Sequence, residues 1–161
     1  MSDLVSDTAM VLAAGLGKRM RPLTATKPKP LIEVGGKPLL DHVLEKLRLA
    51  GVRKVVVNVH YLADALEAHL ATREHGLEVV ISDERGLLLE TGGGLVKAAP
   101  LIDCDPFLAL NSDNLWIDGP ADTLRLLASQ WDGERMDALE HELAEQEAGV
   151  HLRSVTVNLT C

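Results

Sequence analysis

An α/β fold is predicted for this chain of 161 residues, because short strand-like and helix-like segments alternate along it. Apolar or β-branched runs recur, and apolar positions at helical spacing follow each of them after a few residues. Since the connections are short, we expect a mostly parallel sheet with helices on both faces, a Rossmann-like three-layer α/β/α architecture. Aromatic residues make up only 2% of the chain, so the core of this single domain should consist of Leu, Val, Ile and Ala.

The individual elements can be placed in order along the chain. The first expected strand, residues 9–14, contains no polar residue, which is typical of a strand buried on both faces. Pro38 is expected as the first residue of the first helix, and Gly51 stands where glycine usually ends one. Thr91 is expected to cap the third helix, and Pro120 to open the fourth. Later strands are expected at residues 55–59, 77–81 and 107–110, with a brief extended segment at 31–34. The apolar faces of the first, second and fourth helices are expected from Leu39, Leu40, Val43, Leu44 and Leu47, from Leu62, Ala65, Leu66, His69 and Leu70, and from Leu124, Leu127 and Ala128.

Charge and cysteine content argue against several classes of protein. The net charge is −8, yet the first 60 residues carry ten Lys or Arg against five Asp or Glu. A basic first third within an acidic protein with few aromatic residues favours a local anion site over a nucleic-acid-binding surface. Cys104 and Cys161 lie far apart without a Cys-x-x-Cys pair, which argues against a structural zinc site. No apolar stretch reaches the ~20 residues that span a bilayer. The acidic N-terminus also lacks a signal-peptide pattern, so we expect a cytoplasmic protein that does not bind membranes.

A glycine-rich and strongly basic loop follows the first expected strand. Gly15 and Gly17 let the backbone turn sharply and allow a ligand to lie against bare N–H groups. Five cationic side chains follow with no acidic residue among them: Lys18, Arg19, Arg21, Lys27 and Lys29. Pro22, Pro28 and Pro30 restrict this loop to few conformations. A solvated basic surface loop is the alternative, but a stiffened loop with five like charges favours a polyphosphate ligand.

Two further stretches follow strands at the same expected edge of the sheet. Residues 90–94 read Glu-Thr-Gly-Gly-Gly at the start of a helix, where exposed N–H groups allow a flat ring or a phosphate to approach. A flexible helix cap is the alternative for this stretch. Asn111 and Asp113 follow the strand at 107–110, and a carboxylate near phosphates favours a bridging Mg²⁺. An Asx turn explains these two residues equally well.

Together these motifs resemble the signature of the sugar-1-phosphate nucleotidyltransferases. The resemblance lies in Gly15-Leu-Gly-Lys-Arg-Met-Arg-Pro-Leu-Thr24 and in Lys27-Pro-Lys-Pro30. It implies a nucleotidyltransferase fold and an enzyme that joins a nucleoside triphosphate to a sugar 1-phosphate, with Mg²⁺ as cofactor. The catalytic residues would be Arg19 and Lys29, which contact phosphates, and Asp113, which binds the metal. Asn111 would lie near the sugar. The nucleotide-binding residues that the resemblance implies are Ala13, Ala14, Gly15, Gly17, Lys18, Arg19, Lys29, Glu90, Thr91, Gly92 and Gly93.

The stretch at residues 90–94 also bears on which nucleotide is used. Its form, Glu-Thr-Gly-Gly-Gly, resembles the branch of the family that transfers uridylate to N-acetylmuramate 1-phosphate. Guanylyltransferases for mannose 1-phosphate more often read Gly-Thr-Ala-Gly there. The resemblance therefore favours UTP and N-acetylmuramate 1-phosphate, with GTP and mannose 1-phosphate as the alternative.

The resemblance covers only part of the chain, about residues 8–139. It divides the chain into a nucleotide-binding domain, 1–139, and a divergent acidic tail, 140–161. The sugar-binding half of the family is expected to be absent, so the fold should be C-terminally truncated with an exposed sheet edge. Residues 137–148 are expected to form an acidic helix, and residues 155–159 alternate between apolar and polar. A nucleotide-binding module or fragment without turnover is therefore the alternative to an enzyme.

Overall fold

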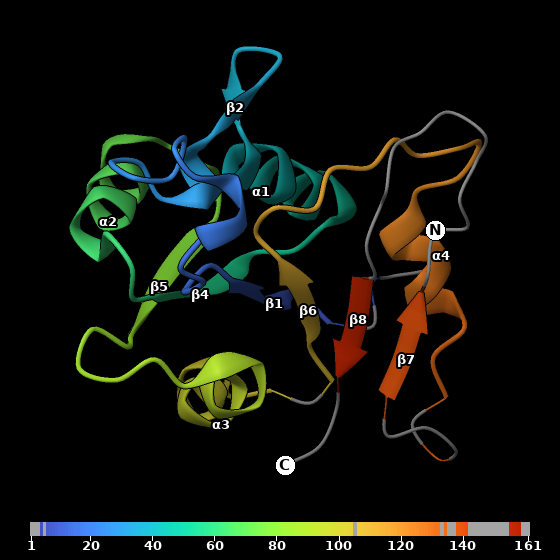
Figure 1. The fold of residues 1–161 in the computed structure, drawn as a ribbon. Coiled ribbons are helices and arrows are strands. Elements are labelled where there is room, and N and C mark those ends of the chain that lie inside the picture. Colours follow the sequence, from blue (N-terminus) through green and yellow to red (C-terminus); the bar gives the residue numbers. More distant parts are fainter. Residues whose placement is uncertain are drawn as a thin grey trace.

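The computed structural model describes residue 4, residues 6–104, 106–132 and 134, and the backbone of residues 138–141 and 155–158. Its main sheet has the strand order β5-β4-β1-β6-β8-β7 (Figure 1). Four neighbouring strands run parallel: β1 (Thr8–Leu12), β4 (Lys54–Val59), β5 (Glu78–Asp83) and β6 (Leu108–Asn111). The predicted α/β fold with a mostly parallel sheet is therefore confirmed.

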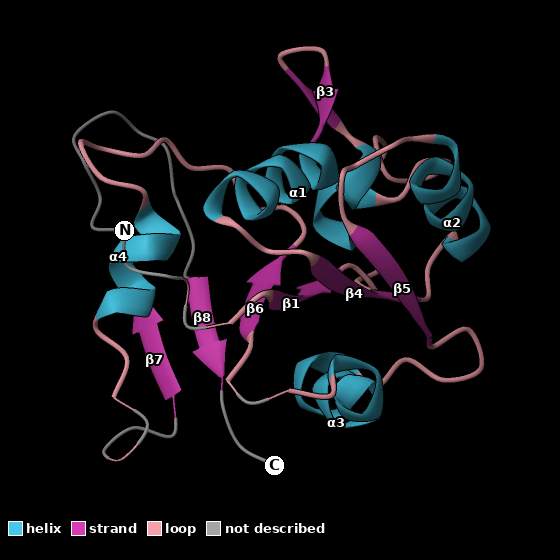
Figure 2. Ribbon diagram, turned by 180° about the vertical axis from the view of Figure 1, so that it is seen from behind, coloured by secondary structure: helices cyan, strands magenta, loops and turns pink. Residues whose placement is uncertain are grey.

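Helices cover both faces of the parallel strands. They are α1 (Leu39–Ala50), α2 (Ala63–Thr72), α3 (Glu90–Ile102) and α4 (Thr123–Ser129). Figure 2 shows α1 and α2 on one side of the sheet and α3 on the other, while α4 lies beside β7. Successive residues of a strand point to opposite faces. Ala9 and Val11 of β1 accordingly pack in the cluster that includes α1 and α2, and Met10 packs toward α3. All three are fully buried, so β1 is covered on both faces as predicted.

The first two helices follow the sequence closely. Gly51 ends α1 with a φ of 110°, in the left-handed region that glycine adopts without strain. Pro38 is the residue before α1 rather than its first residue. The five predicted apolar residues of α1 are all buried. Leu66 and Leu70 of α2 are buried too, but Ala65 is exposed because it lies on the outer face of that helix.

The starts of α3 and α4 differ from the predictions. Thr91 lies inside the first turn of α3 and does not cap it, because the helix begins one residue earlier, at Glu90, with Leu89 at the N-cap position. The N-cap of α4 is Asp122, whose carboxylate accepts a backbone N–H of the first turn. Pro120 therefore lies outside α4.

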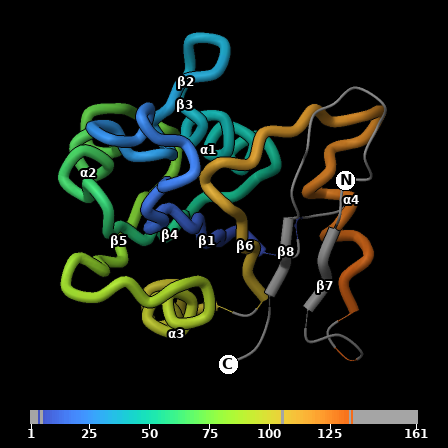
Figure 3. Tube along the Cα trace, in the orientation of Figure 1, coloured from blue at the N-terminus to red at the C-terminus, as the bar shows by residue number. Residues whose placement is uncertain are grey.

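The long connection between β1 and α1 contains two short 3₁₀ turns and a small hairpin. These are η1 (Lys18–Met20), η2 (Lys29–Leu31), β2 (Glu33–Val34) and β3 (Lys37–Pro38). Figure 3 follows the chain from β1 through this connection to the hairpin. In the described part of the chain, no helix has the length and apolar character that crossing a membrane requires.

The C-terminal part contains two strands, and the first of them lies where a helix was expected. β7 (Ala138–His141) pairs antiparallel with β8 (Val155–Asn158), and β8 pairs antiparallel with β6. The predicted acidic helix over 137–148 is therefore wrong for residues 138–141. The edge of β6, expected to be exposed, is covered by β8, and β7 pairs in turn with β8. For residues 138–141 the hydrogen bonds of this pairing outweigh the local helix propensity. Residues 142–150 lie outside the described residues, and the division into domains 1–139 and 140–161 stays a prediction.

Candidate functional site

A cavity of about 590 Å³ opens at the carboxyl ends of β1, β4 and β6. Ligands of open parallel sheets bind at this edge, beyond the ends of the strands. The walls of the cavity come from residues 12–20, 29–30, 58, 88, 90–91 and 111–113. The glycine-rich loop, the start of α3 and the end of β6 are far apart in sequence, and here they enclose one space.

Most of the predicted site residues meet in this cavity. Those that line it are Ala13, Ala14, Gly15, Gly17, Lys18, Arg19, Lys29, Glu90, Thr91, Asn111 and Asp113. Gly92 and Gly93 lie in the first turn of α3 and are not among its lining residues. A Cβ at Gly93 would come within 2.9 Å of the Leu89 side chain, so packing alone requires glycine there. The roles of all these residues in binding and catalysis stay predictions.

The two glycines of the basic loop differ in what surrounds them. Gly17 has a φ of 61°, and a Cβ there would lie 3.0 Å from Thr24 Cγ2, so both the turn and the packing require glycine. The buried Thr24 hydroxyl donates to the Gly17 carbonyl oxygen at 2.6 Å, which closes the loop on itself. Tyr61 of the β4–α2 connection donates its hydroxyl to the Thr24 carbonyl oxygen at 2.8 Å. A Cβ at Gly15 would meet nothing within 4 Å, so the space beside this glycine is open to a ligand.

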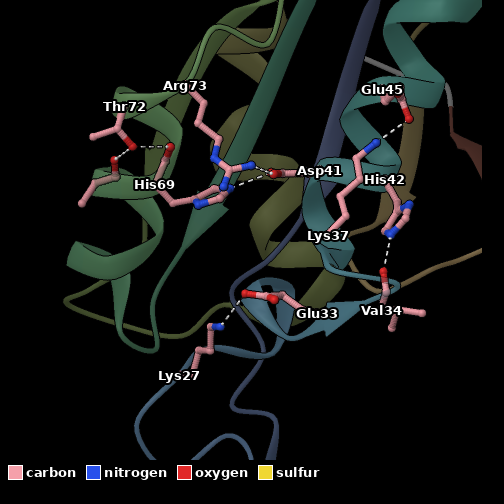
Figure 4. Close-up of polar contacts among 11 residues, drawn as sticks. Lys27, Glu33, Val34, Lys37, Asp41, His42, Glu45, His69, Thr72 and Arg73 are labelled. Atoms are coloured by element: carbon pink, nitrogen blue, oxygen red, sulfur yellow. Dashed lines mark hydrogen bonds and ion pairs between the residues drawn. The ribbon is translucent and has the colours of Figure 1, made fainter.

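The cations of the loop divide into two groups. Lys18 and Arg19 line the cavity, are exposed, and form no ion pair within the part of the chain that the structure describes. Lys27 instead points to Glu33 at 3.3 Å and is not part of the cavity wall (Figure 4). Two uncompensated positive charges beside an open glycine backbone favour an anionic ligand, because such a ligand would neutralise them.

Lys29, the third cation of the loop that lines the cavity, forms an ion pair with Asp113 across the cavity. The pair joins η2 to the residues that follow β6, 84 positions later in the chain. Both side chains remain partly exposed, so a ligand can reach either of them. Without a ligand, each of these residues thus neutralises the other.

Asp113 is the residue to test as a metal ligand. Among the described residues there is no group of three or more His, Cys, Asp or Glu side chains that could hold a metal ion. Mg²⁺, however, is usually bound through one or two carboxylates together with phosphate oxygens. Asp113 in a cavity lined by Lys18 and Arg19 fits a cation that the protein and a phosphate ligand hold jointly.

A second lysine–aspartate pair, Lys46 with Asp118, stabilises the segment that follows Asp113. The Asp118 carboxylate accepts hydrogen bonds from the indole N–H of Trp116 at 3.1 Å and the backbone N–H of Thr123 at 3.0 Å, and it pairs with Lys46 of α1. Burial acts to raise the pKa of Asp118, but the Lys46 ammonium and the Thr123 hydrogen bonds lower it to about 2. This cluster fixes the segment that follows Asp113 against α1.

A buried cluster away from the cavity fastens α1 to α2 (Figure 4). Asp41 of α1 is only 6% exposed, and two side chains contact its carboxylate, His69 from α2 and Arg73 from the residue directly after α2. His69 Nε2 lies 2.6 Å and Arg73 Nη1 2.7 Å from its carboxylate oxygens. Since none of these three residues lines the cavity, we interpret the cluster as structural.

Sequence reasoning missed Asn58 and Tyr61. Asn58 lies at the carboxyl end of β4, lines the cavity, and accepts the N–H of Ala13 at 2.7 Å. The signal was a single polar residue inside the β-branched run at 55–59. Tyr61 is the single tyrosine of the chain, and nothing near it in sequence indicates its contact with the loop.

The comparisons with known proteins agree with this geometry. Residues 8–138 match the model of the nucleotidyl transferase family. Over 132 residues the chain is 54% identical to the N-acetylmuramate alpha-1-phosphate uridylyltransferase of Caulobacter vibrioides, which covers 80% of this chain and 54% of that protein. Over 109 residues it is 42% identical to the mannose-1-phosphate guanylyltransferase catalytic subunit beta of Danio rerio, which covers 65% of this chain and 30% of that protein. The chain thus spans about half the length of the uridylyltransferase that it matches.

The fold is also found among solved structures. HddC from Yersinia pseudotuberculosis, solved in complex with GMP-PN, matches with a TM-score of 0.68 over 94% of this chain and 73% of that one. The two sequences are 22% identical over this match, so the likeness shows a common fold and nothing about ligands.

Proposed function

Because this chain belongs to the nucleotidyl transferase family, we propose that it joins a nucleoside triphosphate to a sugar 1-phosphate and releases pyrophosphate. The observation that carries the proposal is the cavity in which the glycine-rich loop, Lys18, Arg19, Lys29 and Asp113 come together. An open backbone, uncompensated cations and one carboxylate are what a triphosphate with its metal ion requires.

The reaction needs no nucleophile from the protein. A phosphate oxygen of the sugar 1-phosphate attacks the α-phosphorus of the triphosphate, and the bond from that phosphorus to the oxygen bridging to the β-phosphate breaks. Catalysis then consists of holding the two anionic substrates together and neutralising charge. The backbone around Gly15, with Lys18 and Arg19, is suited to the triphosphate, and Lys29 to charge that develops between the substrates. Asn111, at the end of β6, is suited to the sugar.

Mg²⁺ is part of this proposal through Asp113. When bound, the ion would neutralise negative charge on phosphate oxygens. Asp113 would hold it together with the triphosphate. Lys29 would then exchange its carboxylate partner for a phosphate oxygen, so its charge stays compensated throughout.

UTP and N-acetylmuramate 1-phosphate are the substrates that we favour. The name of the relative at 54% identity supports them, and so does the Glu-Thr-Gly-Gly-Gly form of residues 90–94. GTP and mannose 1-phosphate are the alternative, supported by the name of the relative at 42% identity.

A protein that binds the nucleotide without turnover is the alternative of another class. One observation favours it: the chain spans about half the length of the uridylyltransferase from Caulobacter vibrioides. Residues needed for the sugar phosphate could belong to the part of that relative which this chain does not cover.

Calorimetric titration of the 161-residue chain with UTP and with GTP, each with Mg²⁺, tests the proposal, followed by an assay of pyrophosphate release on adding each sugar 1-phosphate. We expect UTP to bind more tightly and N-acetylmuramate 1-phosphate to release pyrophosphate. Binding without release would favour the binding module, and no binding of either nucleotide would overturn the proposal.

The variant Arg19→Ala tests whether the charge of this cavity residue is needed for turnover. We expect turnover to fall by roughly 100-fold or more, because a charge that stabilises the transition state is lost. The fold should be intact, since Arg19 is exposed and forms no ion pair within the described residues. Circular dichroism would check this, and full turnover in a soluble variant would remove Arg19 from the mechanism.

A further inference from the structure

A fully buried carboxyl group lies beneath the cavity and has no part in the mechanism above. Glu84 directly follows β5, and its side chain is 0% exposed. Glutamate is almost never fully buried unless its oxygens have partners, because moving a charged or polar group out of water is unfavourable. The partners of Glu84 therefore indicate why the carboxyl group is there.

Those partners form a chain of hydrogen bonds that connects two walls of the cavity. The N–H of Ala13 donates to Asn58 Oδ1 at 2.7 Å, and Asn58 Nδ2 donates to Glu84 Oε1 at 2.9 Å. Glu84 Oε2 accepts the N–H of Leu89 at 3.3 Å. Asn58 itself is only 2% exposed. One continuous path thus runs from the end of β1, through the ends of β4 and β5, to the start of α3.

The start of α3 sits directly on this pair of side chains. A Cβ at Gly94 would lie 2.9 Å from Glu84 Oε1 and 3.0 Å from Asn58 Nδ2, so only glycine allows this approach. Glu90, the residue after Leu89, has a φ of 57°, which is strained for a residue with a side chain. Such strain persists where the surroundings hold the backbone in place, and the Glu84 hydrogen bond does so one residue earlier.

We propose that Asn58 and Glu84 are positioning residues that hold the start of α3 against the glycine-rich loop. They thereby set the shape of the cavity wall that includes Leu88 and Glu90, which we take as the nucleoside side of the cavity. This inference rests on the proposed function of the cavity. The pair acts through backbone: Leu89 lies between Leu88 and Glu90, and both of these residues line the cavity. The phosphate side depends on Lys18 and Arg19, which the pair does not contact.

A positioning role of this kind predicts different effects on two parts of the ligand, the nucleoside and the triphosphate. Glu84→Gln keeps the volume of the side chain and one acceptor oxygen, so one of its two hydrogen bonds survives. We expect the dissociation constant for UTP with Mg²⁺ to rise about tenfold, while that for inorganic triphosphate with Mg²⁺ stays within about twofold. A role in stability alone would not separate these two ligands in a variant that is folded at the assay temperature.

A reciprocal exchange tests whether the two side chains act through their shared bond. In Asn58→Asp the donor to Glu84 is lost, and in Glu84→Gln an acceptor is lost. When both substitutions are combined, the new carboxylate at position 58 accepts from the new amide at position 84, so the shared bond is restored with its direction reversed. The carboxylate still accepts the Ala13 N–H, and the amide oxygen still accepts the Leu89 N–H. We expect the double variant to bind UTP more tightly than either single variant. Effects of the two substitutions that simply add would contradict the proposal.

Two glycine variants provide a second, matched pair. Gly94→Ala pushes on both side chains and should weaken UTP binding as Glu84→Gln does. Gly86→Ala lies in the same β5–α3 connection, where a Cβ meets nothing within 4 Å, and should leave UTP binding within about twofold of the parent. Equal effects of the two alanines would contradict the proposal.

Amide hydrogen exchange distinguishes failure of this inference from failure of the proposed function. In Glu84→Gln we expect the amides of residues 89–91 to exchange about tenfold faster, whether or not a nucleotide binds. If the parent chain binds neither UTP nor GTP, the proposed function fails. The exchange rates of residues 89–91 still show whether Glu84 holds the start of α3 in place. If the parent binds UTP and Glu84→Gln changes neither exchange nor binding, only the positioning role is overturned.

Discussion

Two lysine–aspartate pairs join the segment after β6 to the N-terminal third of the chain, and only one of them lies in the cavity. Lys29 pairs with Asp113 and Lys46 pairs with Asp118. Their side chains are similarly exposed, at 34% and 29% for the first pair and 30% and 23% for the second. Burial therefore does not distinguish the pairs, and the difference between them has to come from their other partners.

The number of partners of each carboxylate separates the two pairs. Asp118 accepts from Trp116 and Thr123 in addition to Lys46, whose ammonium lies 5.7 Å from the centre of the Trp116 ring. Asp113 has Lys29 as its one hydrogen-bond partner among the described residues. A carboxylate with several local partners fixes the fold, whereas one with unused lone pairs at a cavity can accept a ligand. Number of partners is thus a better guide to function here than charge or exposure.

The same substitution in both pairs tests this comparison most strongly. Asp113→Asn should reduce Mg²⁺-dependent turnover on the order of 100-fold, because the amide replaces the anionic oxygen offered to the metal ion. Its melting temperature should equal that of the parent within about 2 °C. Pyrophosphate release measured over a range of Mg²⁺ concentrations checks the first expectation. An unchanged response to Mg²⁺ would remove Asp113 from the metal site.

Asp118→Asn should show the reverse pattern. The new amide directs N–H groups toward the Lys46 ammonium, so we expect the variant to lose about 1–2 kcal/mol of unfolding free energy. That corresponds to a melting temperature lower by about 3–6 °C. Turnover at 25 °C should stay within about twofold, since Asp118 does not line the cavity. A large loss of turnover without a loss of stability would mean that Asp118 serves the reaction and not the fold, contrary to this comparison.

The pH dependence of stability sharpens the comparison further. The pKa of Asp118 is about 2 in the folded chain, below its ordinary value of 3.8. A lowered pKa stabilises the fold fully above the unfolded value, and the stabilisation is lost as the pH falls from roughly 4 toward 2. Because the carboxyl group is partly exposed, solvent screening limits this contribution to about 1 kcal/mol.

Urea unfolding of the parent and of Asp118→Asn between about pH 5 and pH 2 measures this contribution. The difference in unfolding free energy between the two proteins should shrink by about 1 kcal/mol as the pH falls through this range. Other carboxyl groups titrate equally in both proteins and cancel. A difference that is constant with pH would mean that protonation of Asp118 does not contribute.

The features that the sequence predicted correctly depend on residues that are neighbours along the chain. The apolar run at 9–14 indicated a doubly buried strand, Gly51 the end of α1, and the Gly-x-Gly loop with Asp113 one shared edge of the sheet. Each of these features depends on a few consecutive residues. A short segment of sequence is therefore enough to indicate burial on both faces, a left-handed turn or the end of a strand. The fold class and most of the cavity wall follow from such signals.

What could not be predicted depends on partners distant in the chain. The strand at 138–141 was read as helix because its acidic sequence suits one, while its pairing is decided by the residues of β8, at 155–158. Nothing near Glu84 in the sequence indicates that its side chain is buried, and Gly94 was expected to expose backbone N–H groups to a ligand. In the structure Gly94 instead leaves room for Glu84 and Asn58, two residues from other elements. Contacts between such elements leave no local pattern in the sequence.

The smallest expected effects on stability come from the two lysines themselves. Lys46→Met keeps the apolar stem over Trp116 but removes the charge, and Asp118 still accepts from Trp116 and Thr123. We therefore expect a loss of only about 0.5–1 kcal/mol in unfolding free energy and unchanged turnover. Lys29→Met should leave stability within about 0.5 kcal/mol, since a partly exposed ion pair contributes little, but should abolish most turnover. If both substitutions lowered stability equally and spared turnover, Lys29 and Asp113 would be a second structural pair, and the cavity would have to bind its phosphates through Lys18 and Arg19 alone.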